Sequence, residues 1–439
     1  MSRQLAPPSL RPGRARRRPG SPWRGPLTDT RDIQIDRVGA QGDGIGDRGV
    51  FVPLTLPGEK VRVFPEGSRA ELDSILEPSP DRIAAPCPHF GECGGCSLQH
   101  WSAEPYLAWK RERVIEALSR ESLETEVLAA FASPPGSRRR LALHARPGGK
   151  SGALLGFKGR RSWKLTPLDI CTIADPRLVA AFPALRLLAR PFLEHPKSAP
   201  TLHVTVTRTG LDVNITGVEK RSGGLSADAR VRAAQAAEAG DFARVTLDGD
   251  AIYGARQAVV TLGPASVALP PGAFLQAVPQ AEVAMAQFAV EAVSGAARIA
   301  DLYCGVGTFT FRLAQVGTVM AADSSAPAIA ALKAAGGSAP GLKSIIAEAR
   351  DLARRPALAR ELAKIDAVVF DPPRAGAMEQ AREIGLSKVA RVVGVSCDPA
   401  TFARDARILV DAGFTLERVL PVDQFLWSPH VELVGVFSR

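Results

Sequence analysis

Cysteine is scarce in this chain, and the signals of secretion and of membrane insertion are missing from it. Only 6 of the 439 residues are cysteines, which excludes the disulfide framework of small secreted domains. No run of about 18 apolar residues occurs, so we expect no membrane span. No apolar stretch follows the N-terminal arginines, as a secretory signal would require. We therefore expect a cytoplasmic protein.

The net charge of +10 is concentrated at the N-terminus. Residues 1–28 contain seven arginines and no lysine or acidic residue, so the rest of the chain carries only +3. Because this segment is also rich in proline, we expect a disordered basic tail, which suits phosphate backbones. A merely solubilising extension is the alternative.

Three segments with different patterns follow the tail. Residues 29–83 alternate short apolar runs with glycines, which predicts a small β-barrel. Residues 84–271 combine a cysteine cluster, a helix over about 104–119 capped by Ser102, and strands that carry clustered arginines and lysines. These basic strands are either an RNA-facing surface or an ordinary solvated face.

Residues 272–439 alternate strands with helices, which is typical of a doubly wound α/β domain. The last two strands have no helix between them, so we expect an antiparallel hairpin at the end of the sheet. The expected strands are Ile299–Tyr303, Thr318–Ala322, Ala367–Phe370, Val392–Ser396, Leu416–Pro421 and Val431–Phe437.

A glycine-rich turn follows the first of these strands. The glycines of Cys304-Gly305-Val306-Gly307-Thr308 let the backbone approach a ligand, and the helix start beyond them offers free N–H groups. Asp323, at the end of the next strand, can accept both ribose hydroxyls of a nucleoside. Asp351 either meets an adenine amino group or only caps a helix. The turn lacks the full Gly-x-Gly-x-x-Gly fingerprint of dinucleotide sites, because it continues with Phe309 and Thr310. This absence disfavours NAD-type cofactors.

Two groups of cysteines stand apart from ordinary packing. Cys397 ends an apolar strand in a Ser-Cys-Asp-Pro-Ala-Thr turn, where a thiolate can act as a nucleophile; a buried inert thiol is the alternative. Cys87, Cys93 and Cys96 crowd into ten positions, which indicates a metal site rather than disulfides. Cys171 is the remaining cysteine outside the α/β domain, and four thiolates suit either zinc or an iron–sulfur cluster.

The glycine turn, the Cys397 turn and the Cys-x5-Cys-x2-Cys cluster together resemble the RNA (uracil-5-)-methyltransferases, most closely the iron–sulfur members that act on 23S rRNA. The resemblance covers about residues 29–439. It implies a Rossmann-like, S-adenosylmethionine-dependent methyltransferase domain, preceded by a TRAM-type, OB-like barrel and by a central α+β domain that holds a 4Fe–4S cluster. Uracil methylation of tRNA, and RNA binding without catalysis by the same fold, are the alternatives. We expect a monomer.

The resemblance also assigns the chemistry. Cys397 becomes the nucleophile that adds to carbon 6 of uracil. Glu432, whose pKa burial in an apolar strand would raise, becomes the base that removes the proton from carbon 5, with His430 as the alternative. Arg374 replaces the aromatic residue of amino-group methyltransferases and is expected near the RNA. No Pro-Cys motif occurs there, which disfavours cytosine-5 enzymes.

The resemblance implies two sets of binding residues. The residues expected to contact S-adenosylmethionine are Gln276, Tyr303, Gly305, Thr308, Asp323, Asp351 and Asp371. The expected ligands of the 4Fe–4S cluster are Cys87, Cys93, Cys96 and Cys171. One departure from the family is Val278, which stands where an asparagine is usual.

Overall fold

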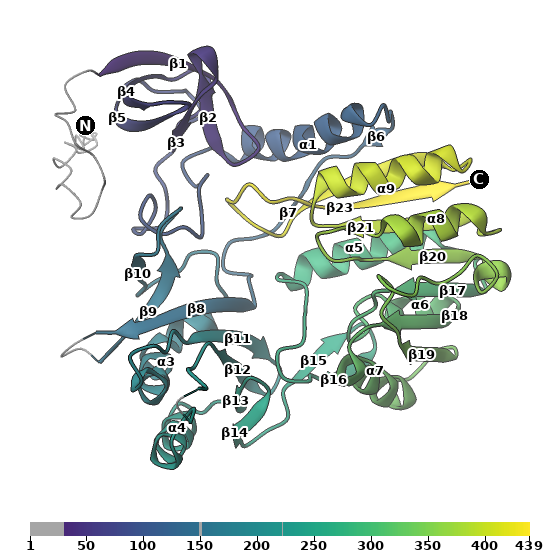
Figure 1. The fold of residues 1–439 in the computed structure, drawn as a ribbon. Helices are drawn as coiled ribbons and strands as arrows, with labels where there is room; N and C mark the ends of the chain where they lie inside the picture. Colours follow the sequence, from purple (N-terminus) through teal and green to yellow (C-terminus); the bar gives the residue numbers. More distant parts are fainter. Residues whose placement is uncertain (1–29, 149–151, 222) are drawn as a thin grey trace, which may run out of the picture.

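The computed structural model describes residues 30–148, 152–221 and 223–439 (Figure 1). The expected basic tail, residues 1–28, lies outside this part of the chain. The described residues form a closed barrel, a seven-stranded sheet, a two-stranded sheet and a nine-stranded sheet.

The barrel comes first in the chain. Alternating apolar residues such as Ile33, Ile35, Val61 and Val63 fill its interior, because side chains of a strand point to opposite faces in turn. Its strands are β1 (Arg31–Val38), β2 (Asp43–Gly46), β3 (Val50–Pro53), β4 (Lys60–Glu66) and β5 (Arg69–Glu77).

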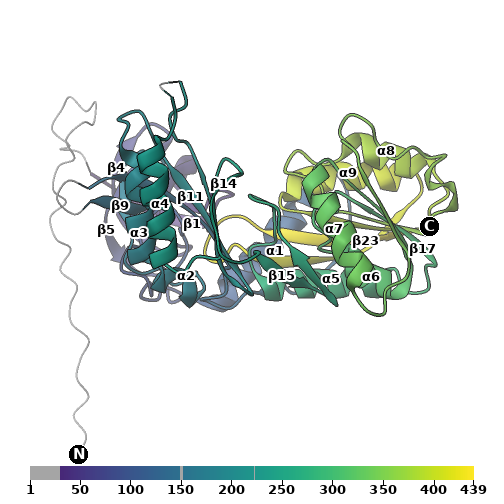
Figure 2. The ribbon, with the colours of Figure 1, turned by 90° about the horizontal axis from the view of Figure 1, so that it is seen from below.

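The seven-stranded sheet has one covered face and one polar face. Leu141, Leu143 and Ala145 of β8 pack into an apolar core with helices α3 (Phe182–Ala189) and α4 (Ala227–Ala239), and Figure 2 shows both helices on the same side of the sheet. In sheet order, the strands are β10 (Leu165–Pro167), β9 (Ala153–Lys158), β8 (Arg140–Pro147), β11 (Thr201–Thr207), β12 (Gly210–Thr216), β13 (Arg244–Leu247) and β14 (Asp250–Gly254).

The nine-stranded sheet is Rossmann-like, which confirms the predicted α/β fold. Parallel strands at its centre lie between two helical layers, α5 (Pro279–Ala292), α6 (Thr310–Val316) and α7 (Ala326–Ser338) on one face and α8 (Met378–Leu386) and α9 (Pro399–Asp411) on the other. In sheet order, the strands are β19 (Ile345–Ala349), β18 (Thr318–Asp323), β17 (Arg298–Leu302), β20 (Ala367–Phe370), β21 (Arg391–Ser396), β23 (Glu432–Ser438), β22 (Thr415–Asp423) and β6 (Glu126–Val127), with β7 (Phe131–Ala132) also on β22. The last two strands of the chain, β22 and β23, pair antiparallel as expected.

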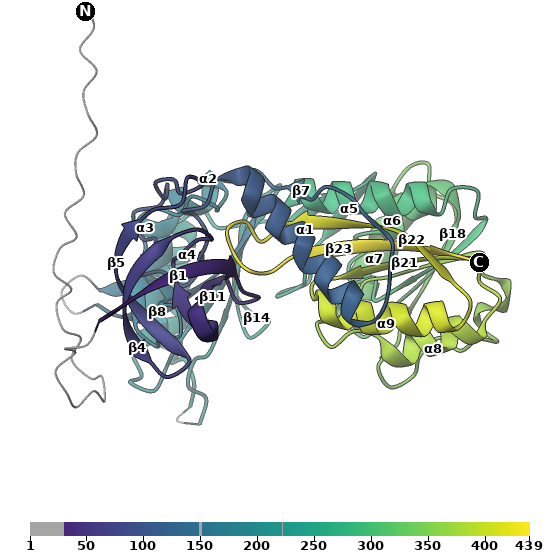
Figure 3. The same ribbon diagram turned by 90° about the horizontal axis from the view of Figure 1, so that it is seen from above.

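Helix α1 (Ala103–Arg120) differs from expectation in two respects. Ser102 occupies its N-cap, but the serine side chain makes no capping hydrogen bond. The helix also packs against α9 and β22 (Figure 3), so residues 103–132 join the nine-stranded sheet although they fall inside the segment 84–271 expected as one central unit. The intervening hairpin β15 (Val259–Leu262) and β16 (Ala265–Ala268) packs against α7. None of the described helices is long and apolar enough to cross a membrane.

A buried ion pair fixes α1 to the end of β22. Lys110 donates to Asp423 at 2.9 Å, and neither side chain is exposed to solvent. The Tyr106 hydroxyl donates to the other oxygen of Asp423 at 2.7 Å and accepts from the Trp427 N–H at 2.8 Å. Lys110 also donates to the carbonyl of His430. These bonds hold both ends of the loop that connects β22 to β23.

Replacing one partner of this pair should destabilise the protein strongly. Lys110→Met leaves the Asp423 carboxylate buried without its cation, which costs roughly 3–5 kcal/mol of unfolding free energy. Urea unfolding measures this difference. Lys60→Met is the matched control, because the Lys60–Glu77 pair is 47% and 71% exposed and an exposed pair contributes at most about 1 kcal/mol. Equal losses of unfolding free energy for the two substitutions would show that the buried Lys110–Asp423 pair has no special stabilising role.

Candidate active site

Four strand ends meet at one edge of the nine-stranded sheet. Strands β17, β20 and β21 are parallel neighbours, so their carboxyl ends lie side by side. Strand β23 runs the other way, and its Leu433 pairs with Ser396, the last residue of β21. Cys397 therefore follows β21 directly beside Glu432, the first residue of β23. The crevice beyond the carboxyl ends of parallel strands is the usual ligand site of such sheets.

The glycine turn after β17 forms an open cradle. Tyr303 and Gly305 both have positive φ angles, 65° and 54°, which a turn this tight requires. Asp323 accepts from the Gly305 N–H at 2.9 Å and from the Ser325 N–H at 2.8 Å. A Cβ atom at Gly305 would meet no atom within 4 Å, so a ligand can reach the backbone here. Gly307 is different, because its Cβ would lie 2.4 Å from the Phe311 ring.

The other residues expected at the cofactor site lie in different surroundings. Thr308 is buried, and its carbonyl accepts from Arg312. Asp351 accepts from the N–H groups of Ala353 and Arg354 at 3.1 and 3.3 Å. It thus caps a turn, and the helix expected after it is not formed. These contacts match the alternative in which Asp351 caps backbone N–H groups, rather than contacting an adenine amino group.

Two glutamines connect the carboxyl groups of Asp371 and Glu432. The Gln276 amide donates to Asp371 at 3.0 Å, and its oxygen accepts from Gln424 at 2.7 Å. The same Gln424 amide donates to Glu432 at 2.6 Å, while its oxygen accepts from the Ala277 N–H at 3.0 Å. We call this chain of contacts, Asp371–Gln276–Gln424–Glu432, the carboxamide bridge. Gln424 is not among the residues predicted from the sequence, because no motif marks it and its partners are distant along the chain.

Both carboxyl groups of the carboxamide bridge hold protons more tightly than usual. Burial is the main cause of the raised pKa of Glu432, and the like charge of Asp371 raises it further. Burial also raises the pKa of Asp371. The amides of Gln424 and Gln276 oppose these shifts because they donate to the ionised forms. Glu432 can therefore exchange a proton near neutral pH.

Cys397 lies half-buried at the start of α9. Asp398 caps this helix by accepting from the N–H groups of Ala400 and Thr401, which fixes the turn that presents the thiol. Burial and the Glu432 carboxylate raise the pKa of the Cys397 thiol, whereas the nearby Arg374 lowers it. Burial and the neighbouring cations lower the pKa of His430, which favours a neutral imidazole.

The four cysteines expected to bind metal line one cavity. Cys87, Cys93, Cys96 and Cys171 surround it together with the Phe157 ring, and all four are free thiols. The Gly95 N–H donates to the sulfur of Cys93 at 3.4 Å. Within the described ranges, however, no three His, Cys, Asp or Glu side chains are arranged to hold a metal ion.

Known proteins resemble this chain over nearly its whole length. A protein described as an uncharacterized RNA methyltransferase of Caulobacter vibrioides is 68% identical over 413 residues, 93% of this chain and 100% of the relative. The 23S rRNA (uracil(1939)-C(5))-methyltransferase RlmD of Chromohalobacter salexigens is 32% identical over 99% of this chain and 94% of its own. A sequence model of the family described as tRNA (Uracil-5-)-methyltransferase matches residues 266–439. This chain belongs to the RNA (uracil-5-)-methyltransferase family.

The solved structure of a family relative supports the same activity. The tRNA (uracil-54, C5)-methyltransferase of Pyrococcus abyssi, in complex with S-adenosyl-L-homocysteine, matches with a TM-score of 0.68 and 25% identity, covering 92% of this chain and 99% of that one. The predicted family is thereby confirmed. As a uracil-5 methyltransferase, the protein transfers a methyl group from S-adenosylmethionine to carbon 5 of uracil in RNA.

The raised pKa of Glu432 predicts a pH-dependent stability difference. A carboxyl group whose pKa is raised by folding stabilises the fold while protonated, and this contribution is lost as the pH rises through the folded pKa. Glu432→Gln should therefore gain stability relative to the wild type between about pH 6 and about pH 9. Urea unfolding at both pH values measures the gain. The exposed Glu71→Gln is the control, and a gap that stays constant with pH for Glu432→Gln would contradict the prediction.

Proposed function

We propose that this enzyme methylates carbon 5 of a uridine in 23S rRNA through a covalent bond between Cys397 and the base. The relative that matches 99% of the chain is named as a 23S rRNA enzyme, and this similarity supports the choice of substrate. Methylation of tRNA is the second candidate, because the Pyrococcus abyssi relative is a tRNA enzyme. The observation that carries the chemistry is the placement of Cys397 beside a buried, proton-holding Glu432.

Cys397 begins the reaction in this proposal. Carbon 5 of uracil is a weak nucleophile, and addition of the Cys397 thiolate to carbon 6 turns it into an enolate carbon. The thiolate must be deprotonated, and Arg374 is the neighbouring group that lowers the pKa of the thiol. S-adenosylmethionine, when bound, supplies the methyl group that carbon 5 takes up.

Glu432 completes the reaction. The proton on carbon 5 passes to the Glu432 carboxylate, the electrons of that C–H bond restore the ring double bond, and the C–S bond to Cys397 breaks. Burial and Asp371 keep the pKa of Glu432 high enough for it to accept this proton. The carboxamide bridge holds the carboxylate in place through Gln424. His430 is the less suitable base, since its backbone carbonyl is held by Lys110 while its ring is at the surface.

The cradle after β17 fits the adenosine part of the cofactor. The open backbone at Gly305 leaves room for the ligand, and Tyr303 lies at the same turn with its ring partly exposed. Asp323 is placed to accept ribose hydroxyls, while Thr308 and Asp351 flank the turn. Gln276 and Asp371 extend this surface toward Cys397, so these two residues would lie between cofactor and uracil.

The cysteine cavity is the proposed site of a 4Fe–4S cluster. Its four thiols line one cavity, and four thiolates suit either such a cluster or a zinc ion. The family resemblance favours the cluster, and zinc is the alternative that metal analysis distinguishes. Cys87, Cys93, Cys96 and Cys171 would hold the cluster, with the Gly95 N–H directed at one sulfur.

The cluster loop would support an RNA-binding hairpin. The Gly94 N–H donates to the Lys158 carbonyl at 3.0 Å, and Thr166 donates to the Glu92 carbonyl at 3.2 Å. The β9–β10 hairpin held in this way presents Trp163, which is 83% exposed, with the Lys158 ammonium 4.2 Å from its ring centroid. An exposed aromatic ring beside a cation suits a stacked nucleotide.

The barrel of residues 29–83 would complete this RNA surface as a TRAM domain. Its Asp43 is fully buried and pairs with Arg69 of the barrel and with Arg160 and Arg161 of the hairpin. One carboxylate faces three guanidinium groups, so the junction keeps a net positive charge. Such a junction attracts phosphate groups.

Two substitutions should stop the reaction at different points. Cys397→Ala cannot attack carbon 6, so it should give no methylation and no adduct. Glu432→Gln should still attack and methylate but should not remove the proton, and its covalent complex with RNA should accumulate. A denaturing gel after incubation with 23S rRNA and S-adenosylmethionine separates the two outcomes, and tRNA in a parallel reaction tests the second substrate.

Two results would contradict the roles proposed for Glu432 and Cys397. A Glu432→Gln enzyme that turns over normally would remove the base assignment from Glu432, and His430→Gln would be tested next. An adduct formed by Cys397→Ala would remove the nucleophile assignment. The exposed Glu71→Gln protein should behave as the wild type in the reactions with 23S rRNA and with tRNA.

The protein purified without oxygen should contain about four iron atoms per chain, as one 4Fe–4S cluster requires. Cys171→Ser removes one proposed ligand, so it should lower the iron content and the visible absorbance. Cys304→Ser is the matched control, because Cys304 is buried at the glycine turn and should not affect iron. Stoichiometric zinc without iron would overturn the cluster assignment.

A further inference from the structure

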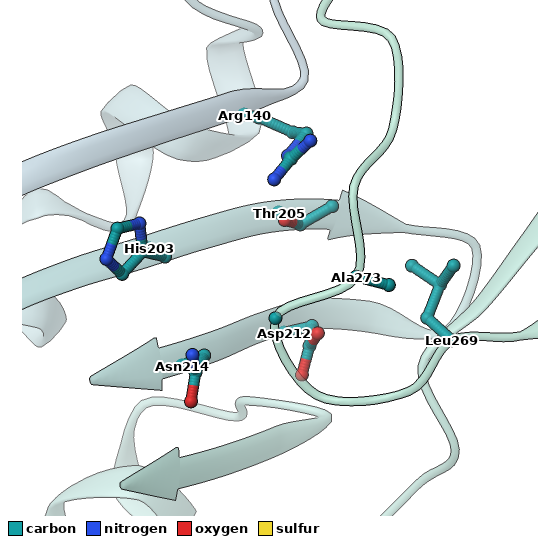
Figure 4. A pocket seen from close by; sticks show the side chains of 8 residues that line it. Arg140, His203, Thr205, Asp212, Asn214, Leu269 and Ala273 are labelled. Atoms are coloured by element: carbon teal, nitrogen blue, oxygen red, sulfur yellow. The ribbon is translucent and has the colours of Figure 1, made fainter. Parts of the chain in front are cut away.

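A polar pocket lies on the open face of the seven-stranded sheet, between β8, β11, β12 and the segment 269–273. Figure 4 shows its side chains, among them Arg140, His203, Thr205, Asp212 and Asn214, directed into one space. None of these residues belongs to the carboxamide bridge or to the cysteine cavity. The core helices α3 and α4 cover the opposite face of the same sheet, so this face is accessible to a ligand.

Asn214 presents a fixed pair of hydrogen-bond donors to this pocket. Its side-chain oxygen accepts from the Thr246 hydroxyl at 2.8 Å and from the Gly249 N–H at 3.2 Å, which orients the amide. The amide nitrogen has no protein acceptor among the described residues. A Cβ atom at Gly272 would lie 3.0 Å from this nitrogen, so the glycine keeps the space in front of it open.

Arg140 supplies the second donor. One guanidinium nitrogen donates to the Leu275 carbonyl at 2.7 Å, and the guanidinium lies 5.4 Å from the centroid of the Phe274 ring. These contacts hold the group over the pocket while other N–H groups stay available. Asp212 does not compete for it, because both Asp212 oxygens accept from Arg244 at 2.8 Å. The pocket therefore offers donors from Asn214 and Arg140, while the Asp212 carboxylate is already paired with Arg244.

The pocket lies next to the proposed catalytic residues along the chain. Leu275, which Arg140 contacts, directly precedes Gln276 of the carboxamide bridge. Arg139, the residue directly before β8, donates to the Gln276 carbonyl at 3.0 Å and, from its backbone N–H, to the Ala277 carbonyl at 2.9 Å. One short segment thus has the pocket on one side and the bridge on the other.

We propose that this pocket binds the base of an RNA nucleotide that flanks the target uridine. The base would be one with carbonyl oxygens, uracil or guanine, because Asn214 and Arg140 offer donors and such oxygens accept hydrogen bonds from amide and guanidinium groups. The inference rests on the proposed function, since it places the nucleotide beside the base that Cys397 attacks. It would let the enzyme select its uridine by the identity of a neighbour.

The chain allows this pocket to be observed directly, because Asn214 is its only asparagine. Protein labelled with asparagine carrying nitrogen-15 in the side chain has one labelled amide, which reports on the pocket without interference. We expect its NMR signals to shift when a short RNA with the target uridine is added to labelled Cys397→Ala protein, which cannot turn over. S-adenosylmethionine alone should leave the signals unchanged. Signals that do not shift at saturating RNA would overturn the proposal.

Abasic substitutions identify the bound group. RNAs that lack the base at one position near the target should lose the shift at a single flanking position. If every abasic RNA still shifts the signals, the pocket binds phosphate or sugar and the proposal for a base is wrong.

Kinetics separate this proposal from the proposed function. Asn214→Asp keeps the oxygen that Thr246 and Gly249 contact but replaces the donor, so it should raise KM for RNA about tenfold, the loss expected for one hydrogen bond. The value of kcat at saturating RNA should not change, and replacing the selected flanking base should have less effect on the variant than on the wild type. Normal adduct formation by Glu432→Gln, without any NMR shift in Cys397→Ala, would reject the pocket alone. A shift in Cys397→Ala, without any adduct formed by Glu432→Gln, would reject the proposed function instead.

Discussion

The carboxamide bridge positions the side chains at the carboxyl edge of the nine-stranded sheet. The buried carboxyl group of Glu432 and the partly buried one of Asp371 lie near each other at the edge of a sheet, where their like charges would repel if both were ionised. Gln276 donates to Asp371, and Gln424 donates both to the Gln276 oxygen and to Glu432. The bridge joins β20, β22, β23 and the segment before α5, so its four residues hold four separate parts of the chain at one place.

Other parts of the protein connect to this bridge through buried polar contacts. The Lys110–Asp423 pair fixes the residue before Gln424 to α1. Arg139 ties the seven-stranded sheet to Gln276 and Ala277, and also pairs with Glu282 of α5. A charged group that is buried without its partner is strongly unfavourable, so these contacts help to fix the position of the seven-stranded sheet relative to Cys397. The surface that would bind RNA and the residues that would modify it are therefore positioned by the same interactions.

The sequence predicted the Rossmann-like fold because its strands are apolar runs with clear limits. The expected Ala367–Phe370 strand agrees with β20 at both ends, and β22 and β23 form the expected hairpin. The placement of Cys397 beside Glu432 follows from strand pairing, which a motif alone does not contain. Gln424 escaped notice because an amide gains significance only from its partners, and those lie 8 and 148 residues away. Asp351 was expected at the start of a helix, but the structure forms a turn there. The Asp351 side chain caps that turn.

In the proposed reaction, Cys397 bonds to the target uracil and Glu432 removes the proton from carbon 5. RNA that carries 5-fluorouridine at the target offers a direct test. A base can remove a proton from carbon 5 but cannot remove fluorine as F⁺, so the complex should remain covalent after methyl transfer. The wild-type enzyme is incubated with this RNA and S-adenosylmethionine, digested, and examined by peptide mass spectrometry. The expected product is a methylated fluoro-dihydrouridine attached to the peptide that contains Cys397. An adduct on another cysteine such as Cys304, or methylated RNA released without any adduct, would contradict it.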